Sequence, residues 1–392
     1  MRESKIDVVC PSAFDNLGHP EYAKNIASEL ITQFNCIVEL YSKDYRGDDN
    51  YVNLFNKIIL KVHYLKADFF GLRDSLHIKT KFLRIFGRFA GFFYKVFSFV
   101  IYIKFYANFF RKYKHKNNTI LHLEFEPVSY SICSFLYCIR HKNIFVLHSV
   151  NFEHSNFIFN LYKKISLFLI KRELRKGAKL IVHSPMAHHR LVNENIDGQK
   201  IIIGGWGHGP IKLKIHRVSN DVINCLSFGV VREDKRIKEL VKLFAAANDA
   251  RLRLTIAGKF VDYPSSLLKK IIKEFETKTQ FIIIDRYLHD DEMENLYSEA
   301  DTSVLSHAKN FNSSSGPLFK SIEFALPILC FSYNDVREIV LSQKIGIVAD
   351  LTSFNPHNLY KTCCKIKKIS IKKDTFYSWR NISSRIYRGI IK

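Results

Sequence analysis

Two segments in the second half of the chain carry the residue types that hold a diphosphate. In the first, Arg232 and Lys235 come soon after a short apolar run that ends near Val230. A guanidinium offers a planar set of donors and an ammonium offers a point charge, and phosphate oxygens accept from both. In open parallel sheets, ligands bind outside the carboxyl ends of the strands. The segment therefore predicts a diphosphate site at such an edge, with a solvated loop of a basic protein as the alternative.

The second segment has the signature of a helix start. Ser315 is a suitable N-cap, and Gly316 and Pro317 follow it as the first helical residues. The unpaired amides and the positive dipole end of a helix start attract an anion. Lys320 would oppose the dipole unless a phosphate or a carboxylate lies nearby, and Glu323, about two turns in, could reach hydroxyls beside the phosphate. The alternative is an ordinary capped helix with Glu323 on its solvated face.

The elements that would position these residues alternate along the chain. Short apolar runs rich in β-branched residues alternate with helical patterns, which indicates βαβ units around parallel sheets. A Gly-rich connection at residues 204–210 divides the alternation into two series, so we expect an α/β protein with two Rossmann-like domains. The expected strands are Ile6–Cys10, Ile120–Leu123, Ile144–His148, Leu180–His183 and Ile201–Ile203, and then Cys225–Val230, Leu252–Ala257, Phe281–Ile284, Thr302–Ser306 and Ile328–Phe331. The expected helices are Glu21–Phe34, Ile237–Ala247, Asp291–Ala300 and Tyr377–Ile391.

Residues 75–118 depart from this alternation, because basic and aromatic side chains dominate there and acidic ones are absent. Within residues 82–103, apolar side chains, most of them Phe, recur at helical spacing with basic residues on the other side. Lys95 and Lys104 interrupt the run before it reaches the roughly 20 apolar residues that a spanning helix needs. The pattern predicts a helix that lies on an anionic membrane surface or one that packs its Phe side chains on the first sheet.

The composition restricts the classes of function. The chain has 392 residues, of which 47% are hydrophobic, enough for two or three domains with substantial cores. Its 60 Lys and Arg against 37 Asp and Glu give a net charge of +23, which attracts phosphates, anionic lipid headgroups or nucleic acid. No apolar signal segment opens the sequence, so we expect a cytoplasmic protein. P-loop, dinucleotide-binding, zinc-hydrolase and serine-hydrolase motifs are absent, so those chemistries are not indicated.

Several segments together resemble a known family. FGVVREDKRIKEL, LTIAGKF, EMENLYSEADTSVLSH and SSSGPLFKSIEFALPILCF look like the donor half of the retaining, family 4-like glycosyltransferases of GT-B fold. PSAFDNLGHPEYAKNIASEL and LRKGAKLIVHSPMAHHRL look like the acceptor half. The resemblance implies that Arg232 and Lys235 contact the donor diphosphate and that Glu323 binds the ribose. The family pattern has two Glu residues, and Ser315 stands at the first position, as in relatives with lipid-linked or exopolysaccharide acceptors.

The resemblance also implies site residues in the first half of the chain. Gly18 suits a close approach of the donor diphosphate to the backbone, because glycine has no Cβ. His148 would contact the donor sugar or the incoming hydroxyl, whereas a His at the end of a strand is also often a packing residue, and both interpretations stay open. His19, Glu153 and His154 would contact the acceptor.

The fold implied by the resemblance is GT-B, two Rossmann-like domains with a cleft between them. The acceptor-side domain would comprise residues 1–208, including the segment 75–118. The nucleotide-sugar-binding domain would comprise residues 209–375, and a C-terminal helix at 376–392 would cross back to the first domain.

The implied activity is transfer of a sugar from a nucleoside diphosphate donor to a glycan or polyprenyl-linked acceptor, with retention and with no metal or cofactor. We expect His148, Arg232 and Lys235 to be catalytic, and peripheral contact with the inner face of the plasma membrane. The residues expected to bind the donor are Gly18, Arg232, Lys235, Ser315, Gly316, Pro317, Lys320 and Glu323. A glycosyltransferase-like protein that binds without catalysing and a basic nucleic-acid-binding protein are the alternatives, although we expect no nucleic acid partner.

Overall fold

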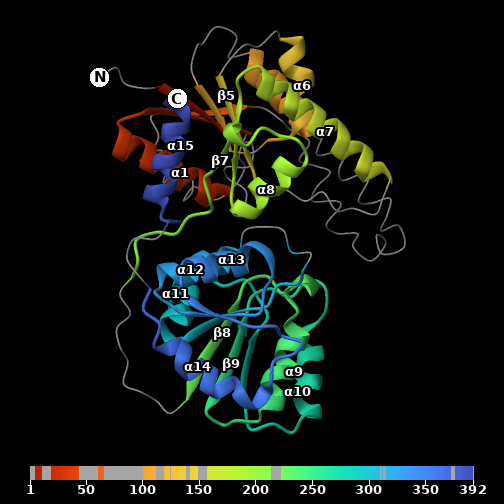
Figure 1. Cartoon of the computed structure of the whole chain (residues 1–392), viewed down its shortest axis with the longest axis vertical. Helices are drawn as coiled ribbons and strands as arrows, with labels where there is room; N and C mark the ends of the chain where they lie inside the picture. The colour runs from red at the N-terminus through yellow and green to blue at the C-terminus, as the bar shows by residue number, and fades with distance from the viewer. Residues whose placement is uncertain are drawn as a thin grey trace. The chain divides into compact units, whose positions relative to one another are not determined.

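The chain divides into two compact units in a computed structural model (Figure 1). The first unit comprises Met1–Gly205 and Ile382–Lys392, and the second comprises Trp206–Asn381. The structure describes residues 5–10, 19–43, 61–65, 100–111, 119–123, 125–137, 142–148, 157–212, 222–309, 311, 315–371 and 376–391.

The first unit is built on a seven-stranded sheet in which all paired strands are parallel. The strand order is β3-β2-β1-β4-β5-β6-β7. Its strands are β1 (Lys5–Val9), β2 (Ile37–Lys43), β3 (Lys61–Leu65), β4 (Thr119–His122), β5 (Lys142–Leu147), β6 (Lys179–Val182) and β7 (Ile201–Ile203). The helices are α1 (His19–Phe34), α6 (Pro127–Leu136), α7 (Phe157–Arg175) and α8 (Pro185–Asn193), together with residues 100–111. Buried, β-branched runs such as IDVV in β1 are typical of parallel strands covered on both faces.

The helix at residues 100–111 shows what the described part of the basic aromatic segment does. Its fully buried aromatic side chains are Phe105, Tyr106, Phe109 and Phe110. They belong to one hydrophobic cluster with Phe145 of β5, whereas Lys104 and Arg111 are exposed. Of the apolar stripe predicted at residues 82–103, the described part contains Val100, which is 40% exposed, and Ile103, which packs against this cluster, so the choice between the membrane and packing interpretations of the stripe stays a prediction. Residues 82–99 lie outside the described residues. Within the described ranges, no helix combines the length and apolar content needed to cross a bilayer.

The last helix, α15 (Trp379–Ile391), returns to the first unit. Arg385 donates to the carbonyls of Ile203 and Gly204 at 2.9 and 2.7 Å, and Tyr387 stacks on Phe34 with ring centroids 4.2 Å apart. The unit boundary falls inside this helix because the residues before Ile382 pair with the chain near His208, through an N–H to carbonyl bond of 3.0 Å from His208 to Tyr377.

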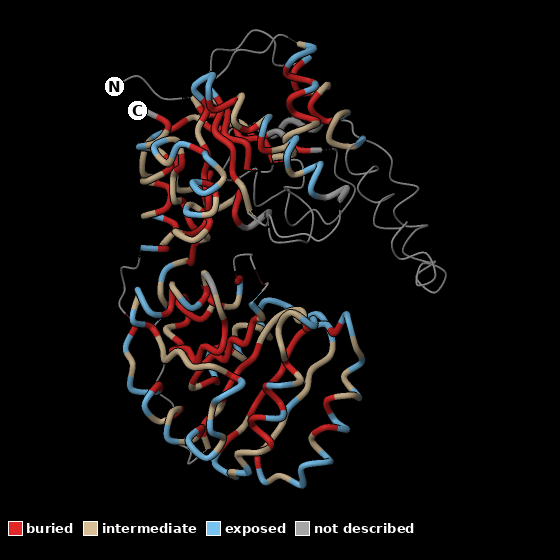
Figure 2. The backbone as a smooth tube through the Cα atoms, turned by 45° about the vertical axis from the view of Figure 1, so that its right-hand side comes forward, coloured by how far each residue is buried: buried red, intermediate tan, exposed pale blue. Residues whose placement is uncertain are grey.

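The second unit contains a six-stranded parallel sheet of order β10-β9-β8-β11-β12-β13. Its strands are β8 (Ile223–Phe228), β9 (Leu252–Ala257), β10 (Gln280–Ile284), β11 (Thr302–Leu305), β12 (Ile328–Cys330) and β13 (Gly346–Val348). The helices are α9 (Ile237–Ala247), α10 (Ser265–Glu274), α11 (Asp290–Glu299), α12 (Gly316–Glu323), α13 (Asn334–Ser342) and α14 (Leu359–Lys367). Figure 2 shows the buried strands at the centre of this unit and exposed residues along its outer helices.

The strand order places two loops at one edge of the second sheet. The chain leaves β8 through α9 to reach β9 on one side, and it later returns to β11 on the other side of β8. The loops that follow β8 and β11 therefore leave the same carboxyl edge at the point where the strand order reverses. Ligands of open α/β sheets bind at such a point.

Candidate functional site

The loop after β8 folds Lys235 back over Gly229. Gly229 has φ +101°, a conformation that favours glycine, and the Lys235 ammonium donates to the Phe228 carbonyl at 3.3 Å. A Cβ placed on Gly229 would lie 2.9 Å from Lys235 Nζ and 3.3 Å from Pro317 Cγ. The ammonium and the first turn of α12 are therefore neighbours. The structure thus brings Lys235, from the first of the two predicted diphosphate-binding segments, close to Pro317, from the second.

Two hydrogen bonds hold the loop after β11 against the loop after β8. The Ser306 hydroxyl donates to the Lys235 carbonyl at 2.6 Å, and the Ala308 amide donates to the Asp234 carbonyl at 2.7 Å. Between them lies His307, whose amide donates to Ser332 Oγ at 2.9 Å and whose Nδ1 lies 2.9 Å from the same oxygen. The His307 ring also packs on Phe311 with centroids 4.0 Å apart.

Two cations, Lys235 and Arg232, and one acid, Asp234, determine the electrostatics of this cluster. Burial, and next to it the charge of Arg232, lower the pKa of Lys235 to about 8, against an opposing effect of Asp234. Burial and the charges of Lys235 and Arg232 hold the pKa of His307 well below its ordinary value, so this imidazole is neutral. Arg232 itself pairs with Asp234, at 2.9 Å between Nη2 and Oδ2. A bound anion would stabilise the protonated Lys235.

The start of α12 offers a polar group that no described residue satisfies. Ser315 is the N-cap residue with an extended backbone, its hydroxyl makes no capping bond, and the residue is only 3% exposed. Among the described residues, its buried Oγ has no hydrogen-bond partner. A Cβ on Gly316 would meet no described atom within 4 Å. The hydroxyl, the helix dipole and the nearby Lys235 together suit an anion such as a phosphate group.

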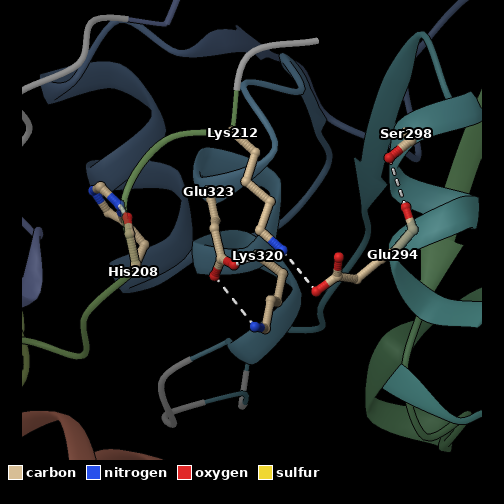
Figure 3. A network of polar contacts seen from close by, with 7 residues as sticks. His208, Lys212, Glu294, Ser298, Lys320 and Glu323 are labelled. Carbon is tan, nitrogen blue, oxygen red and sulfur yellow. Dashed lines mark hydrogen bonds and ion pairs between the residues drawn. The ribbon is translucent and has the colours of Figure 1, made fainter. Parts of the chain in front are cut away.

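Glu323 lies at the other end of α12, within a network of ion pairs (Figure 3). Its carboxylate lies 3.2 Å from the Lys320 ammonium and 3.7 Å from that of Lys212, and Lys212 also pairs with Glu294 at 2.6 Å. Glu323 is 8% exposed, so the interpretation of a solvated glutamate is wrong. The sequence predicted a phosphate or a carboxylate near Lys320, and the structure places the carboxylate of Glu323 there.

The backbone at Gly209 lies beside this carboxylate. A Cβ there would lie 3.4 Å from Glu323 Cδ. The neighbouring His208 donates through Nδ1 to the Gly209 carbonyl at 2.7 Å. Burial lowers the pKa of His208, while that carbonyl and Glu323 act in the opposite direction. The connection at residues 208–209 therefore helps to hold Glu323 in place.

In the first unit, His148 belongs to a chain of two imidazoles. Its Nε2 lies 2.5 Å from the Leu123 carbonyl and its Nδ1 lies 2.9 Å from His183 Nε2. Because a carbonyl only accepts, Nε2 of His148 carries the proton, and in the neutral ring Nδ1 accepts from His183. Both rings contact Tyr22 edge-on, with centroids 5.4 and 5.3 Å away. These contacts favour the packing interpretation of His148, and its contact with a substrate stays a prediction.

Four predicted residues cannot be placed. Gly18, Glu153 and His154 lie outside the described residues, and of His19 only the backbone, at the start of α1, is described.

Reasoning from the sequence missed His307 and Ser332. His307 carries a signal, since it lies two residues after the end of β11, at the same edge as Lys235. Ser332 lies two residues after the end of β12, and only the fold brings it to His307.

The fold of the chain is similar to that of solved structures of glycosyltransferases. The chain is similar to the lipopolysaccharide outer core galactosyltransferase WaaB in its apo form, with 12% identity, a TM-score of 0.65 and coverage of 99% of both chains. It is also similar to Anabaena Alr3699/HepE in complex with UDP and glucose, with 12% identity, a TM-score of 0.58 and coverage of 99% of this chain and 95% of that one.

A third similar structure is an epimerase. The Neisseria meningitidis UDP-GlcNAc 2-epimerase bound to UDP-GlcNAc has 12% identity, a TM-score of 0.55 and coverage of 99% of both chains. No protein-family model matches the sequence, and neither does any curated protein. The predicted fold class is confirmed: the chain has the two-domain, Rossmann-like GT-B fold of these glycosyltransferases.

Proposed function

We propose that this protein is a glycosyltransferase that moves a sugar from a nucleoside diphosphate donor to a lipid-linked or polysaccharide acceptor during cell-surface glycan assembly. The observation that carries the proposal is the Lys235 ammonium beside the first turn of α12, which begins with the buried hydroxyl of Ser315, a group that bonds to no described residue. Such a group of donors suits the two phosphates of a sugar donor. The UDP and UDP-GlcNAc bound by structures of the same fold support a nucleotide sugar as the ligand.

In this mechanism the bond between the anomeric carbon and the diphosphate oxygen breaks, and the electron pair leaves with the diphosphate. The acceptor oxygen forms the new bond on the same face of the sugar, which retains the anomeric configuration. A donor phosphate oxygen takes the proton of the acceptor hydroxyl, so no metal or cofactor is required. Arg232, Lys235 and the start of α12 stabilise the charge that grows on the leaving group, which is usually the largest single contribution in such sites.

Glu323 is proposed to bind the ribose hydroxyls, and its ion pairs with Lys320 and Lys212 orient its carboxylate. Gly18 is proposed to face the diphosphate, and His148 to face the donor sugar or the incoming hydroxyl. His19, Glu153 and His154 are proposed to contact the acceptor. Peripheral contact with an anionic membrane is part of the same proposal, since a polyprenyl-linked acceptor resides there.

The first experiment is a thermal-shift screen with UDP, GDP, ADP and CMP sugars. Ligand that binds only the folded state raises stability by about 2.7 kcal/mol at one hundred times its Kd. Stabilisation by one nucleotide series identifies the donor base. Binding of RNA or DNA with a steep dependence on salt, without stabilisation by any nucleotide sugar, would favour the nucleic-acid-binding alternative.

The second experiment measures turnover with the donor found in the screen. Arg232→Ala or Lys235→Ala should lower turnover about 100-fold or more, the usual loss when one preorganised donor to a developing anion is removed. Lys238→Ala is the matched control, since Lys238 pairs with Glu233 on the outer side of the same region. Unchanged transfer in both site variants would reject their role. Nucleotide binding without transfer would indicate a non-catalytic protein, and interconversion of UDP-GlcNAc with its epimer would indicate an epimerase.

A further inference from the structure

Exposed apolar side chains concentrate on two neighbouring helices of the first unit. Of the 15 large apolar side chains exposed in the described residues, seven belong to α6 and α7, which pack against each other (Figure 1). The seven are Ile132, Phe135, Leu136, Leu161, Tyr162, Ile165 and Phe168. Phe135, Leu136 and Phe168 are 74%, 67% and 60% exposed. Large apolar side chains gathered in this way mark an interaction site, whereas single ones do not.

The spacing shows that these side chains form a second apolar face on each helix. Ile132, Phe135 and Leu136 stand at i, i+3 and i+4 in α6, and Leu161, Ile165 and Phe168 stand at i, i+4 and i+7 in α7. The first apolar face of each helix is already used in the core, through Cys133 in α6 and residues 167, 170 and 174 in α7. Among the described residues, the outward apolar face of the two helices takes no part in that core cluster.

Basic side chains outnumber acidic ones on this surface, where the Glu126 carboxylate at the start of α6 accepts from the Tyr162 hydroxyl. Lys164, Lys171 and Arg175 flank the apolar positions of α7, at three, ten and fourteen residues after Leu161. The described residues of α6 and α7 include one acid, Glu173, whose side chain is 3% exposed and pairs with Arg172 and Lys176. Three basic side chains beside exposed Phe and Leu form a face that complements a negatively charged surface.

The composition of the face distinguishes a membrane from a protein partner. Protein interfaces are depleted of Lys, and the apolar centre of such an interface excludes charge. Helices that lie on membranes instead combine large apolar side chains with Lys and Arg, which reach the phosphate layer while the apolar groups enter the acyl boundary.

We propose that the α6–α7 face, formed by the seven exposed apolar residues with Lys164, Lys171 and Arg175, docks on the surface of an anionic lipid bilayer. The inference names the surface for the membrane contact proposed above, which was predicted from a different segment, and it does not require that sugar transfer occurs. Phe135 and Phe168 enter the interface, and the three cations bind lipid phosphates.

The experiment is flotation of the full chain with vesicles of phosphatidylcholine alone or of an equimolar mixture with phosphatidylglycerol, at low salt. Each Lys or Arg near an anionic surface contributes roughly fivefold in partition coefficient. The triple variant Lys164→Glu, Lys171→Glu, Arg175→Glu should therefore bind the mixed vesicles about 100-fold more weakly or worse. The matched control replaces Lys269, Lys270 and Lys273, which are exposed on α10, by Glu and changes the net charge equally.

The apolar half of the proposal has its own pair of variants. Phe135→Ser with Phe168→Ser should lower partition more than tenfold, whereas Val261→Ser with Tyr287→Ser, at side chains 59% and 73% exposed in the second unit, should leave it unchanged. Circular dichroism and the melting temperature verify that each variant folds.

Equal loss in the α10 control would mean that total charge alone matters, and it would overturn the proposal. Unchanged flotation of both α6–α7 variants would also overturn it. The same holds if the protein is a dimer and the Phe→Ser variant dissociates the dimer without a change in lipid binding. Thermal shifts with the UDP, GDP, ADP and CMP sugars should be the same in the wild type and in the α6–α7 variants. If no nucleotide sugar stabilises any of them while flotation behaves as expected, the proposed transferase activity fails and the docking surface stands.

Discussion

Replacing Lys235 by Met tests the candidate site through protein stability. Burial and Arg232 lower the pKa of this lysine from 10.5 to about 8. Because the folded pKa lies below the unfolded one, the protonated lysine destabilises the folded protein. This cost is fully present below about pH 8 and disappears as the pH rises from there to about 10.5. At about 1.4 kcal/mol per pKa unit, the cost at neutral pH is at most about 3.5 kcal/mol, and it is smaller to the extent that water reaches the half-buried side chain.

Lys235→Met keeps the length of the aliphatic stem and removes the charge. We expect urea unfolding at neutral pH to give a variant that is more stable than the wild type by about 1 to 3 kcal/mol. The difference should shrink toward zero near pH 10, where the wild type has lost the proton. The variant should also lose most of the stabilisation by UDP or by whichever nucleotide the screen identifies. In the wild type, nucleotide affinity should fall as the pH rises above about 8, since the ligand favours the protonated lysine.

Lys238→Met is the control, since its ammonium pairs with Glu233 at 2.6 Å at the protein surface. It should change neither the stability by more than about 0.5 kcal/mol nor the nucleotide effect. The reasoning is refuted if Lys235→Met lowers stability at neutral pH as a core truncation does, or if it leaves the stabilisation by nucleotide intact.

Two further predictions concern the buried hydroxyl of Ser315 and the space for a methyl group at Gly207. Ser315→Ala should leave stability unchanged or raise it by up to about 1 kcal/mol, because it removes a buried hydroxyl with no described partner, and it should weaken nucleotide binding about tenfold or more. Ser383→Ala, at a similarly buried hydroxyl of α15, should leave nucleotide binding unchanged, and isothermal titration compares the two. Gly207→Ala should cost about 1 to 3 kcal/mol in urea unfolding, because a Cβ there would lie 2.3 Å from the Trp379 ring. Gly198→Ala, whose Cβ contacts begin at 3.4 Å, should cost less, and equal costs would contradict the steric argument.

Much of the fold was predictable because its strands are buried on both faces. The strands Ile201–Ile203 and Leu252–Ala257 and the helix Ile237–Ala247 were predicted with their observed bounds. Ile201–Ile203 is a uniform apolar run, Leu252–Ala257 is mostly apolar, and Ile237–Ala247 has a single apolar stripe, and such patterns are the strongest signals in a sequence.

The elements that were missed have weaker patterns. In β2 (Ile37–Lys43) charged and apolar residues mix, and β13 (Gly346–Val348) has three residues. The helix α6 is apolar on nearly all sides, because one face joins the core and another is exposed, so it shows no single stripe.

The sequence predicted which loops form the candidate site, but it did not predict the contacts between their side chains. The rule that ligands bind at the carboxyl edge where strand order reverses brings the loop after β8 and the loop after β11 together. The fold of Lys235 over Gly229 depends on positive φ angles at Gly229 and at Arg236, and an arginine gives no sign of this in a sequence. The neutral state of His307 likewise depends on burial and on two cations that are distant in sequence.

The serine at position 315 leaves the charge of Lys235 without a neighbouring carboxylate that the family pattern would provide. In the family that the sequence resembles, a glutamate stands at the position of Ser315, two residues before the proline that lies beside Lys235. A carboxylate there would offset the lysine charge. With serine, the described acid that opposes the shift of Lys235 is Asp234, which already pairs with Arg232, so burial and the charge of Arg232 lower the pKa of the lysine. In the proposed function, the phosphates of the donor supply the negative charge. A donor phosphate would then form the ion pair with Lys235 that a protein carboxylate would otherwise form. This ion pair favours the binding of a diphosphate over that of a neutral sugar at the site.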